Sequence, residues 1–264
     1  MIFKTLFSGS GGNCSYLKAG NTEILIDAGG STRRIECALK ELNTSLSNIS
    51  AIYITHEHSD HVSALPVLLR SHGIPVYITA ESAICMCSDA TSDLFREHFY
   101  TIQPGKVYET GDIALIPFAT PHDSAMSVGY RICVQGKECL GYATDTGHVT
   151  DTMRRFLSGC KRVVVESNHD VKMLKNGPYP PYLKHRILSQ NGHLSNNDCA
   201  EFVCELVDSG CESIMLAHLS KENNTPDAAY DASKSALEAH GVRIGKDVQL
   251  AVAAEKYICD ICLT

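Results

Sequence analysis

One stretch constrains how this chain can fold more than any other: the sequence His-Glu-His-Ser-Asp-His at 56–61. It follows the apolar run at 52–55 and precedes a helical pattern that begins near Val62. Four of its six residues are metal-ligand types, in the order H-x-H-x-D-H. A solvated loop needs polar residues, but it does not need three imidazoles and a carboxylate in this register. The stretch therefore predicts a metal site on a loop between a strand and a helix.

The spacing of this motif can serve two metal ions. His56 and His58 lie two positions apart on an extended loop, so their side chains point the same way and can bind one ion. Asp60 and His61 lie where the chain turns into the helix, and they can bind a second ion. We therefore expect a dinuclear site.

Length and composition indicate one α/β domain over residues 1–264. The chain is 44% hydrophobic and 20% charged, which is ordinary globular composition. Strand and helix patterns alternate in both halves, and no linker or low-complexity segment separates them. No stretch approaches the roughly 20 apolar residues of a membrane span, and 1–7 is too short for a signal peptide. We therefore expect a cytoplasmic protein without a membrane contact.

The chain contains 12 cysteines. Without an export signal, and in a chain of this length, we expect them to be reduced and mostly buried as small apolar residues. Cys259 and Cys262 form a C-x-x-C near the end of the chain, which can bind a metal or act as a redox pair. No second C-x-x-C accompanies it, so a plain structural role is the alternative.

Further metal-ligand residues follow apolar runs that resemble strands. His122, Asp145 and His218 each come shortly after such a run. Taken singly, each would more often be a hydrogen-bonded structural residue. Because functional sites in α/β proteins gather where strand ends meet, we expect the three loops to converge with the H-x-H-x-D-H loop on one edge of the sheet. Asp27 ends another strand, where its carboxylate can accept a hydrogen bond from a metal-bound histidine.

Charge is distributed unevenly along the chain. The net charge of -7 argues against a protein that coats nucleic acid by bulk attraction. The segment 154–186, however, carries eight basic and two acidic residues, which leaves the remainder of the chain at -13. A basic patch on an acidic protein is typical of an enzyme that acts on a polyanion. The alternative is a solvated face whose lysines only confer solubility.

The order of these ligand types resembles that of the metallo-β-lactamase-fold hydrolases, and the match covers nearly the whole chain. The resemblance implies an α/β fold of this family, an αββα four-layer sandwich. Family members that open β-lactams usually carry Cys where this chain has Asp145, so antibiotic hydrolysis is disfavoured. The resemblance implies three ligand groups: His56, His58 and His122 for the first metal, Asp60, His61 and His218 for the second, and Asp145 between the two.

Three later motifs resemble the YycJ (WalJ) branch, whose members are similar to exonucleases: Glu-Ser-Asn-His-Asp at 166–170, Gly-His-Leu-Ser-Asn at 192–196 and Ala-His-Leu-Ser at 217–220. The turn Ser-Gly-Ser-Gly-Gly-Asn at 8–13 fits too, although the branch more often has Ser at Gly11. By itself this turn predicts only a tight reversal between strands, because it lacks the lysine of a P-loop and leads into a strand. The interval between Asp145 and His218 is too short for the extra domain of the β-CASP nucleases.

The ligand set indicates the chemistry. Imidazole and carboxylate without thiolate suit Zn, Mn or Fe, and two such ions can hold a hydroxide between them and offset charge on a phosphoryl transition state. Asp60 could orient that hydroxide. His193 resembles a histidine that assists at the scissile phosphate in tRNA 3′-processing nucleases, and it could protonate the leaving oxygen. A histidine that only starts a helix is the alternative. The candidate substrate contacts are Asn168, His169, Lys184, Arg186 and Ser195.

These observations favour a dinuclear metallohydrolase that cleaves phosphodiesters, and most of all an exonuclease on DNA. A small-molecule hydrolase, either a cyclic phosphodiesterase or a thioesterase, is a second hypothesis on the same metals. A metal-holding scaffold that binds a partner without turnover is a third. Nothing in the sequence points to a particular protein partner.

Overall fold

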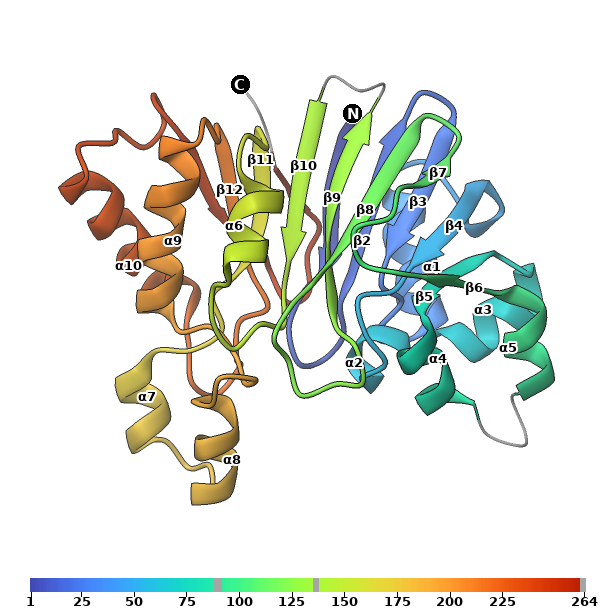
Figure 1. Cartoon of the computed structure of the whole chain (residues 1–264), viewed down its shortest axis with the longest axis horizontal. Helices are drawn as coiled ribbons and strands as arrows, with labels where there is room; N and C mark the ends of the chain where they lie inside the picture. The colour runs from blue at the N-terminus through green and yellow to red at the C-terminus, as the bar shows by residue number, and fades with distance from the viewer. Residues whose placement is uncertain (88–91, 135–137, 262–264) are drawn as a thin grey trace.

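The computed structural model describes residues 1–87, 92–134 and 138–261. Within them the strands form two seven-stranded sheets that lie face to face (Figure 1). The first sheet has the order β14-β1-β2-β3-β4-β5-β6 and the second β13-β12-β11-β10-β9-β8-β7. The strands of the first sheet are β1 (Ile2–Phe7), β2 (Cys14–Ala19), β3 (Thr22–Ile26), β4 (Ile49–Tyr53), β5 (Val76–Thr79), β6 (Phe99–Ile102) and β14 (Cys259–Asp260). Those of the second are β7 (Tyr108–Thr110), β8 (Ile113–Ala119), β9 (Val128–Val134), β10 (Glu138–Ala143), β11 (Arg162–Glu166), β12 (Ser213–Ala217) and β13 (Gln249–Val252).

Helices cover the outer face of each sheet, which confirms the expected four layers (Figure 1). The helices before β7 are α1 (Thr32–Glu41), α2 (Ser59–Val62), α3 (Leu65–His72), α4 (Ala80–Met86) and α5 (Ser92–His98), with a short 3₁₀ helix, η1 (Leu46–Asn48), after α1. Those after β10 are α6 (Asp151–Leu157), α7 (Val171–Asn176), α8 (Pro181–Ile187), α9 (Asn196–Asp208) and α10 (Pro226–Ala239). No helix in the described part of the chain combines the length and the apolar composition needed to cross a membrane.

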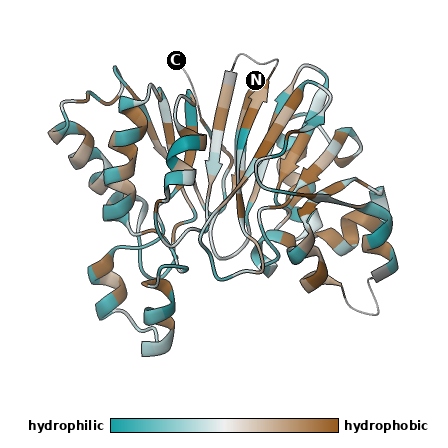
Figure 2. Cartoon of the chain, viewed as in Figure 1, coloured by the Kyte–Doolittle hydropathy of each residue, from teal (hydrophilic) through white to brown (hydrophobic). Residues whose placement is uncertain are grey.

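Three apolar clusters fill the spaces between these layers. On β12, Ile214 and Leu216 pack into the cluster beneath α6, α9 and α10, whereas Met215 and Ala217 pack into the cluster between the two sheets. This is the alternation of a strand that is buried on both faces. Figure 2 shows the same pattern, with hydrophobic strands at the centre and hydrophilic positions on the outer helices.

Most predicted elements are present, and a few differ. The helical pattern from Val62 to Leu69 is split, because α2 ends at Val62 and α3 begins at Leu65. The sequence of 81–98 is mostly of helical pattern, and the structure has α4 and α5 there, with residues 88–91 outside the described residues. The irregular stretch after Asn168 contains α7 and α8. The two helices are short, and Pro180 and Pro181 stand at the start of α8, so helical periodicity could not build up there.

The prediction that the cysteines are reduced is wrong for one pair. Cys133 and Cys139 form a disulfide, because they face each other across the antiparallel strands β9 and β10 with Cα atoms 4.3 Å apart. The free thiols include exposed ones at Cys37, Cys85 and Cys87 as well as buried ones. Of the C-x-x-C near the end of the chain, Cys262 lies outside the described residues.

The sheet topology brings the predicted site residues to one edge. β10, β11 and β12 run parallel, and β8 runs in the same direction because β9 is antiparallel to both β8 and β10. The carboxyl ends of these strands therefore lie together, at the bottom of Figure 1. The two sheets are joined at this edge, where the Val128 N–H donates to the Thr55 carbonyl at 3.0 Å. The loop that follows β4 thus meets the loops that follow β8, β10 and β12.

Candidate metal centre and active site

The H-x-H-x-D-H loop is held by backbone hydrogen bonds to the turn after β3. The Ala28 N–H donates to the His61 carbonyl at 2.7 Å, and the Asn13 N–H donates to the Asp60 carbonyl at 2.8 Å. Gly29 makes this approach possible, because a Cβ on it would lie 1.8 Å from the Asp60 carbonyl oxygen. The side chains of 56–61 are therefore positioned by the backbone, before any ligand contributes.

Three histidines form a first cluster. The ring nitrogens of His56, His58 and His122 lie within 4.8 Å of one another, and His58 Nδ1 is 3.3 Å from His122 Nε2. His122 Nδ1 donates to the Gly192 carbonyl at 3.0 Å, so its Nε2 carries the lone pair that faces the cluster. All three residues come from loops that follow strands, as the sequence predicted.

A second cluster consists of Asp60, His61 and His218. Asp60 Oδ2 lies 3.4 Å from His61 Nε2 and 3.6 Å from His218 Nε2. His61 Nδ1 donates to Asp27 Oδ2 at 2.8 Å, which fixes the ring and directs Nε2 into the cluster. Asp27 is fully buried and also accepts the Thr55 N–H at 2.8 Å. It therefore has the hydrogen bond to a clustered histidine that its place at the end of a strand suggested.

Asp145 lies between the two clusters. Its Oδ2 is 3.3 Å from His61 Nε2, and its Oδ1 is 3.8 Å from His122 Nε2. One carboxylate thus reaches a histidine of each cluster. The structure brings together all seven residues that the sequence singled out as metal ligands.

Charge within this site favours a cation. Burial by itself would lower the pKa of His61, but the carboxylates of Asp145 and Asp27 outweigh that effect and raise the pKa to about 10. Burial would raise the pKa of Asp60, and its hydrogen bonds with His218 and His61 instead hold that pKa well below its ordinary value. The buried carboxylates therefore stabilise positive charge at the centre of the cluster.

Unpaired buried atoms test whether metal ions fit here. His56 Nε2, Asp145 Oδ2 and His218 Nε2 are all buried without a hydrogen-bond partner among the described residues. Such atoms are costly unless a ligand satisfies them. They belong to the same groups of mutually close donors, which supply imidazole and carboxylate but no thiolate. These donors fit divalent metal ions of the Zn, Mn or Fe kind.

Glu166 is a site residue that sequence reasoning missed. It ends β11, is fully buried, and its Oε1 accepts hydrogen bonds from Nδ1 of His193 and Nδ1 of His218, each at 2.8 Å. Its Oε2 accepts the Thr146 N–H at 2.8 Å and the Leu194 N–H at 3.1 Å. The available signal was a carboxylate at the end of a buried strand, next to the other strand ends of the site.

His193 lies beside this cluster and lines the cleft above it. Glu166 accepts its Nδ1–H, which leaves Nε2 as the ring nitrogen that can act in the cleft. Its Nδ1 is 3.8 Å from Asp145 Oδ1. The structure thus brings both residues predicted to be catalytic, Asp60 and His193, to the same cleft.

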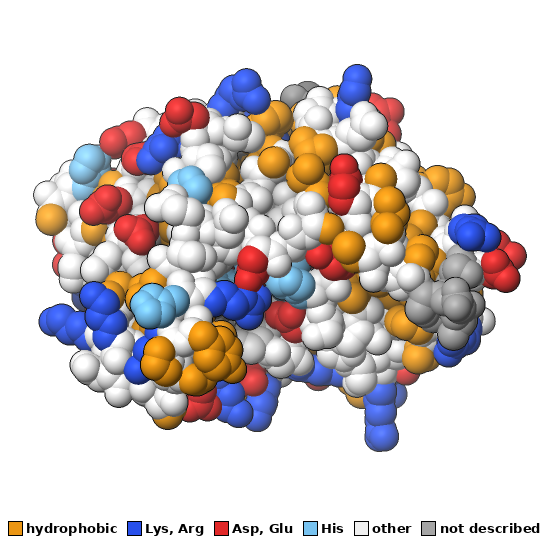
Figure 3. Space-filling model, turned by 60° about the horizontal axis from the view of Figure 1, so that its bottom comes forward, with side chains coloured by type: hydrophobic (Ala, Val, Ile, Leu, Met, Phe, Trp, Pro, Cys, Tyr) orange, Lys and Arg blue, Asp and Glu red, His pale blue; other side chains and the backbone are white. Residues whose placement is uncertain are grey.

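The cleft has a volume of about 220 Å³ and opens on the face shown in Figure 3, where histidine, acidic and basic side chains gather. One wall is the segment around α8, including Tyr179 and Arg186. Arg186 forms a two-pronged ion pair with Asp123, in which Nη2 and Oδ1 are 3.0 Å apart. A wall that carries one ion-paired arginine and one tyrosine therefore faces four of the metal-ligand residues. Among the described residues, the cleft is lined by Ser10, His58, Asp60, Asp145, Asn168, Tyr179, Leu183, Arg186, Ile187, His193, His218 and Ser220.

Of the five predicted substrate contacts, Asn168 and Arg186 line the cleft. Lys184 is half-buried on α8 and does not line the cleft, and its Nζ donates to the Lys175 carbonyl at 2.8 Å. His169 is buried and Ser195 is the N-cap of α9, where its hydroxyl accepts the backbone N–H of Asp198 at 3.1 Å. The structure therefore does not bring His169 or Ser195 to the cleft surface.

The glycine-rich turn takes part in the site, which its sequence alone did not predict. Asn13 Nδ2 lies 3.1 Å from Asp60 Oδ2 and 3.0 Å from His61 Nε2. The Ser8 hydroxyl accepts the backbone N–H of His218 at 2.8 Å. The turn between β1 and β2 thus supports residues from both halves of the chain.

Comparison with known proteins agrees with this geometry. The model of the β-lactamase superfamily domain matches residues 22–218. The exodeoxyribonuclease YycJ of Bacillus anthracis is 35% identical over 248 residues, which are 94% of this chain and 93% of that protein. The exodeoxyribonuclease WalJ of Streptococcus pneumoniae is 35% identical over 251 residues, which are 94% of this chain and 92% of that protein.

Solved structures share the fold at lower identity. The metallo-β-lactamase fold protein YhfI from Bacillus subtilis has a TM-score of 0.69 and 16% identity, over 98% of this chain and all of that chain. Zn²⁺-bound PqqB from Methylobacterium extorquens has a TM-score of 0.70 and 18% identity, with the same coverage. These similarities establish the fold, and the two exodeoxyribonucleases are similar over nearly the full length.

Proposed function

Because the chain belongs to the β-lactamase superfamily of metal-dependent hydrolases, and within it to the family of the YycJ and WalJ exodeoxyribonucleases, we propose that it is a metal-dependent exodeoxyribonuclease. One observation carries this proposal: seven His and Asp side chains, three of them with unpaired buried atoms, lie together, and four of the seven line a cleft that Arg186 also lines. Residues 1–264 act as one hydrolase domain in this proposal. It is supported by the apolar cluster that joins strands of both sheets.

The site holds two divalent ions in this proposal. His56, His58 and His122 bind the first ion, and the cluster of Asp60, His61 and His218 binds the second. Asp145 would be shared between the two groups, which is supported by its 3.3 Å distance to His61 and its 3.8 Å distance to His122. Bound divalent ions supply an activated water and offset the charge that develops on a phosphate.

The protein's own groups orient the substrate and move the proton. Glu166 accepts His193 Nδ1–H, so it fixes the tautomer and holds Nε2 toward the cleft, where it can protonate the leaving oxygen. Asp60, held by two histidines, orients the attacking water. Arg186 and the Asn168 amide contact phosphate oxygens, and Lys184 contacts the strand farther from the cut. Phosphate contacts of this kind position a strand without reading its bases.

The basic segment favours a polymeric substrate over a small ester. If Arg186, Lys184 and one more cation each contact a phosphate, KM for DNA rises roughly 20- to 40-fold between 50 and 200 mM salt. A small neutral ester would respond little to the same change. Flat salt dependence on DNA would move the assignment to a small-molecule hydrolase.

The test is a time course with end-labelled double-stranded and single-stranded DNA in Mn²⁺, in Zn²⁺ and in chelator. Metal-dependent release of mononucleotides is the expected result, and the end that loses its label first gives the direction. Asp145→Ala and His58→Ala abolish release while the far-ultraviolet circular dichroism stays native. Asp231→Ala and His72→Ala, at exposed positions, serve as matched controls and keep full activity. DNA that is bound but never shortened in any metal would indicate a scaffold instead.

A further inference from the structure

A second and larger cavity lies next to the metal cleft. It has a volume of about 550 Å³, within the range of roughly 300–1,000 Å³ that is usual for small-molecule sites. Ser10 and Ser220 line both cavities, so the two adjoin each other. None of the seven ligand residues and neither predicted catalytic residue lines the larger cavity. Its lining comes from the glycine-rich turn at 8–13, from residues 219–226 and from the segment 253–257 after β13.

Arg34 of α1 holds two walls of this cavity in place. Its Nη1 donates to the Gly11 carbonyl at 3.4 Å, and its Nη2 donates to the Glu255 carbonyl. The guanidinium also lies over the Phe7 ring, 3.9 Å from the ring centroid. One side chain thus ties the glycine-rich turn to the segment after β13. The cavity is built into the fold by these contacts.

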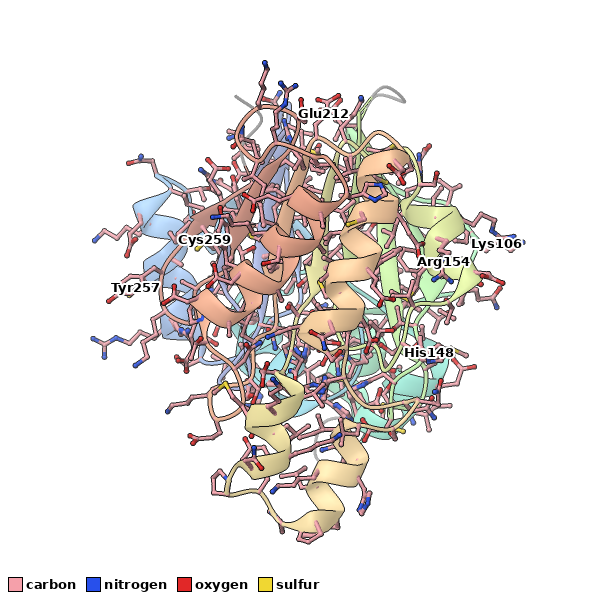
Figure 4. All side chains as sticks on the ribbon, turned by 90° about the vertical axis from the view of Figure 1, so that its left-hand side faces the viewer. Lys106, His148, Arg154, Glu212, Tyr257 and Cys259 are labelled. Carbon is pink, nitrogen blue, oxygen red and sulfur yellow. A yellow bond between two sulfur atoms is a disulfide. The ribbon has the colours of Figure 1, made fainter. Side chains whose placement is uncertain are left out.

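The lining has the chemistry of a nucleoside site. Leu219, Pro226 and Ala253 provide apolar surface, and the aromatic ring of Tyr257 is 76% exposed. Figure 4 shows Tyr257 at the outer edge of the molecule. Nucleobases stack on exposed aromatic rings whatever their sequence. The same lining offers serine and threonine hydroxyls for a sugar and two lysines, against one glutamate, for flanking phosphates.

We propose that this cavity binds the terminal nucleoside of the strand that is cut, with its base stacked on Tyr257. The inference rests on the proposed exodeoxyribonuclease activity and names the subsite that selects its substrate. The small polar cleft receives the phosphodiester, and the adjoining larger cavity receives the nucleoside beside it. A cavity of this size accommodates a nucleoside but not a duplex, so it selects a strand end over an internal position.

The test compares Tyr257→Ala and Tyr257→Phe with the wild type on two oligonucleotides. One carries a normal base at the terminal position, and the other carries an abasic residue there. Loss of a base–aromatic stack predicts a roughly 5- to 150-fold rise in KM for Tyr257→Ala on the normal end. On the abasic end the wild-type KM is higher by the same factor, because that substrate lacks the base that would stack. Tyr257→Ala does not raise KM on the abasic end any further, because the variant and the abasic residue remove the same contact. Tyr257→Phe keeps the ring and restores the wild-type KM.

The matched control is Tyr100→Ala, which removes a half-exposed tyrosine from β6 and leaves KM unchanged on both substrates. Equal KM values for Tyr257→Ala and wild type on the normal end would overturn the subsite while leaving the nuclease activity established. A further rise in KM for Tyr257→Ala on the abasic end would also overturn the subsite, because Tyr257 would then contact some part of the substrate other than the base. A wild type that shortens no oligonucleotide in any metal would overturn the activity and the subsite together.

Discussion

Glu166→Gln tests how the carboxylate behind the site supports it. The carboxylate accepts four hydrogen bonds, two from imidazoles of His193 and His218 and two from the backbone N–H groups of Thr146 and Leu194. Glutamine has the same shape, but one of its two ends is an NH₂ donor. Whichever way the amide is placed, two buried donors face another donor.

The expected magnitude follows from those two mismatches. Each buried donor left without an acceptor costs about 1–3 kcal/mol, so Glu166→Gln lowers the free energy of unfolding by about 2–6 kcal/mol. Because Glu166 also fixes the ring of His218, the affinity for metal falls roughly 10- to 100-fold. Turnover on labelled DNA falls further, since His193 loses its defined tautomer.

The assay is urea unfolding in chelator, followed by circular dichroism, together with metal titration of the folded protein. Glu201→Gln, at an exposed position of α9, is the control, and it changes the free energy of unfolding by no more than about 0.5 kcal/mol. If Glu166→Gln were as stable as that control and bound metal as tightly as the wild type, the role derived for Glu166, which is to hold the rings of His193 and His218 in place, would be refuted.

Three further outcomes are expected. Gly29→Ala places a Cβ 1.8 Å from the Asp60 carbonyl oxygen and lowers the free energy of unfolding by about 1–3 kcal/mol; an unchanged urea midpoint would contradict this close approach. Metal added at 100 times its Kd raises the free energy of unfolding by about 2.7 kcal/mol in the wild type but not in Asp145→Ala, and an equal rise in both would exclude Asp145 as a ligand. Burial lowers the pKa of His169 to about 4 from 6.5, so the unfolded chain binds a proton there that the native state does not. The free energy of unfolding is therefore highest above pH 6.5 and falls by up to about 3 kcal/mol as the pH is lowered to 4. His169→Gln removes this pH dependence, which urea unfolding at several pH values measures.

Sequence reasoning succeeded where the type of a residue and its position in the chain both indicated a metal ligand. His122, Asp145 and His218 are weak signals singly, but each follows an apolar strand, and parallel strands bring their carboxyl ends to one edge. The α/β class was predictable for a similar reason, since apolar runs of strand length alternate with helical periodicity in both halves. The four-layer sandwich was implied only by the resemblance to the metallo-β-lactamase-fold hydrolases.

The misses have other causes, and the first of them is a contact between segments that are far apart in sequence. Nothing within the turn at 8–13 shows that Asn13 will lie 3.1 Å from Asp60. Ser195 was expected at the substrate, but its hydroxyl is used at the start of α9, a role that the same residue type fills equally well. The disulfide between Cys133 and Cys139 depended on the register of β9 and β10, which composition does not specify.

Backbone conformation adds an independent reason to regard this edge as functional. Four non-glycine residues in the described chain have positive φ, and three of them belong to the site: Asp27 at 61°, Asp145 at 57° and His218 at 57°. Each lies just after a strand, where glycine would adopt the same conformation without strain. A left-handed residue with a side chain costs about 1–2 kcal/mol, although Asp tolerates this conformation better than most residue types. Glycine would relieve that strain but would remove a carboxylate or an imidazole from the cluster. The presence of three such residues at one site is therefore explained by the donor atoms that they carry, because stability alone would favour glycine at each position.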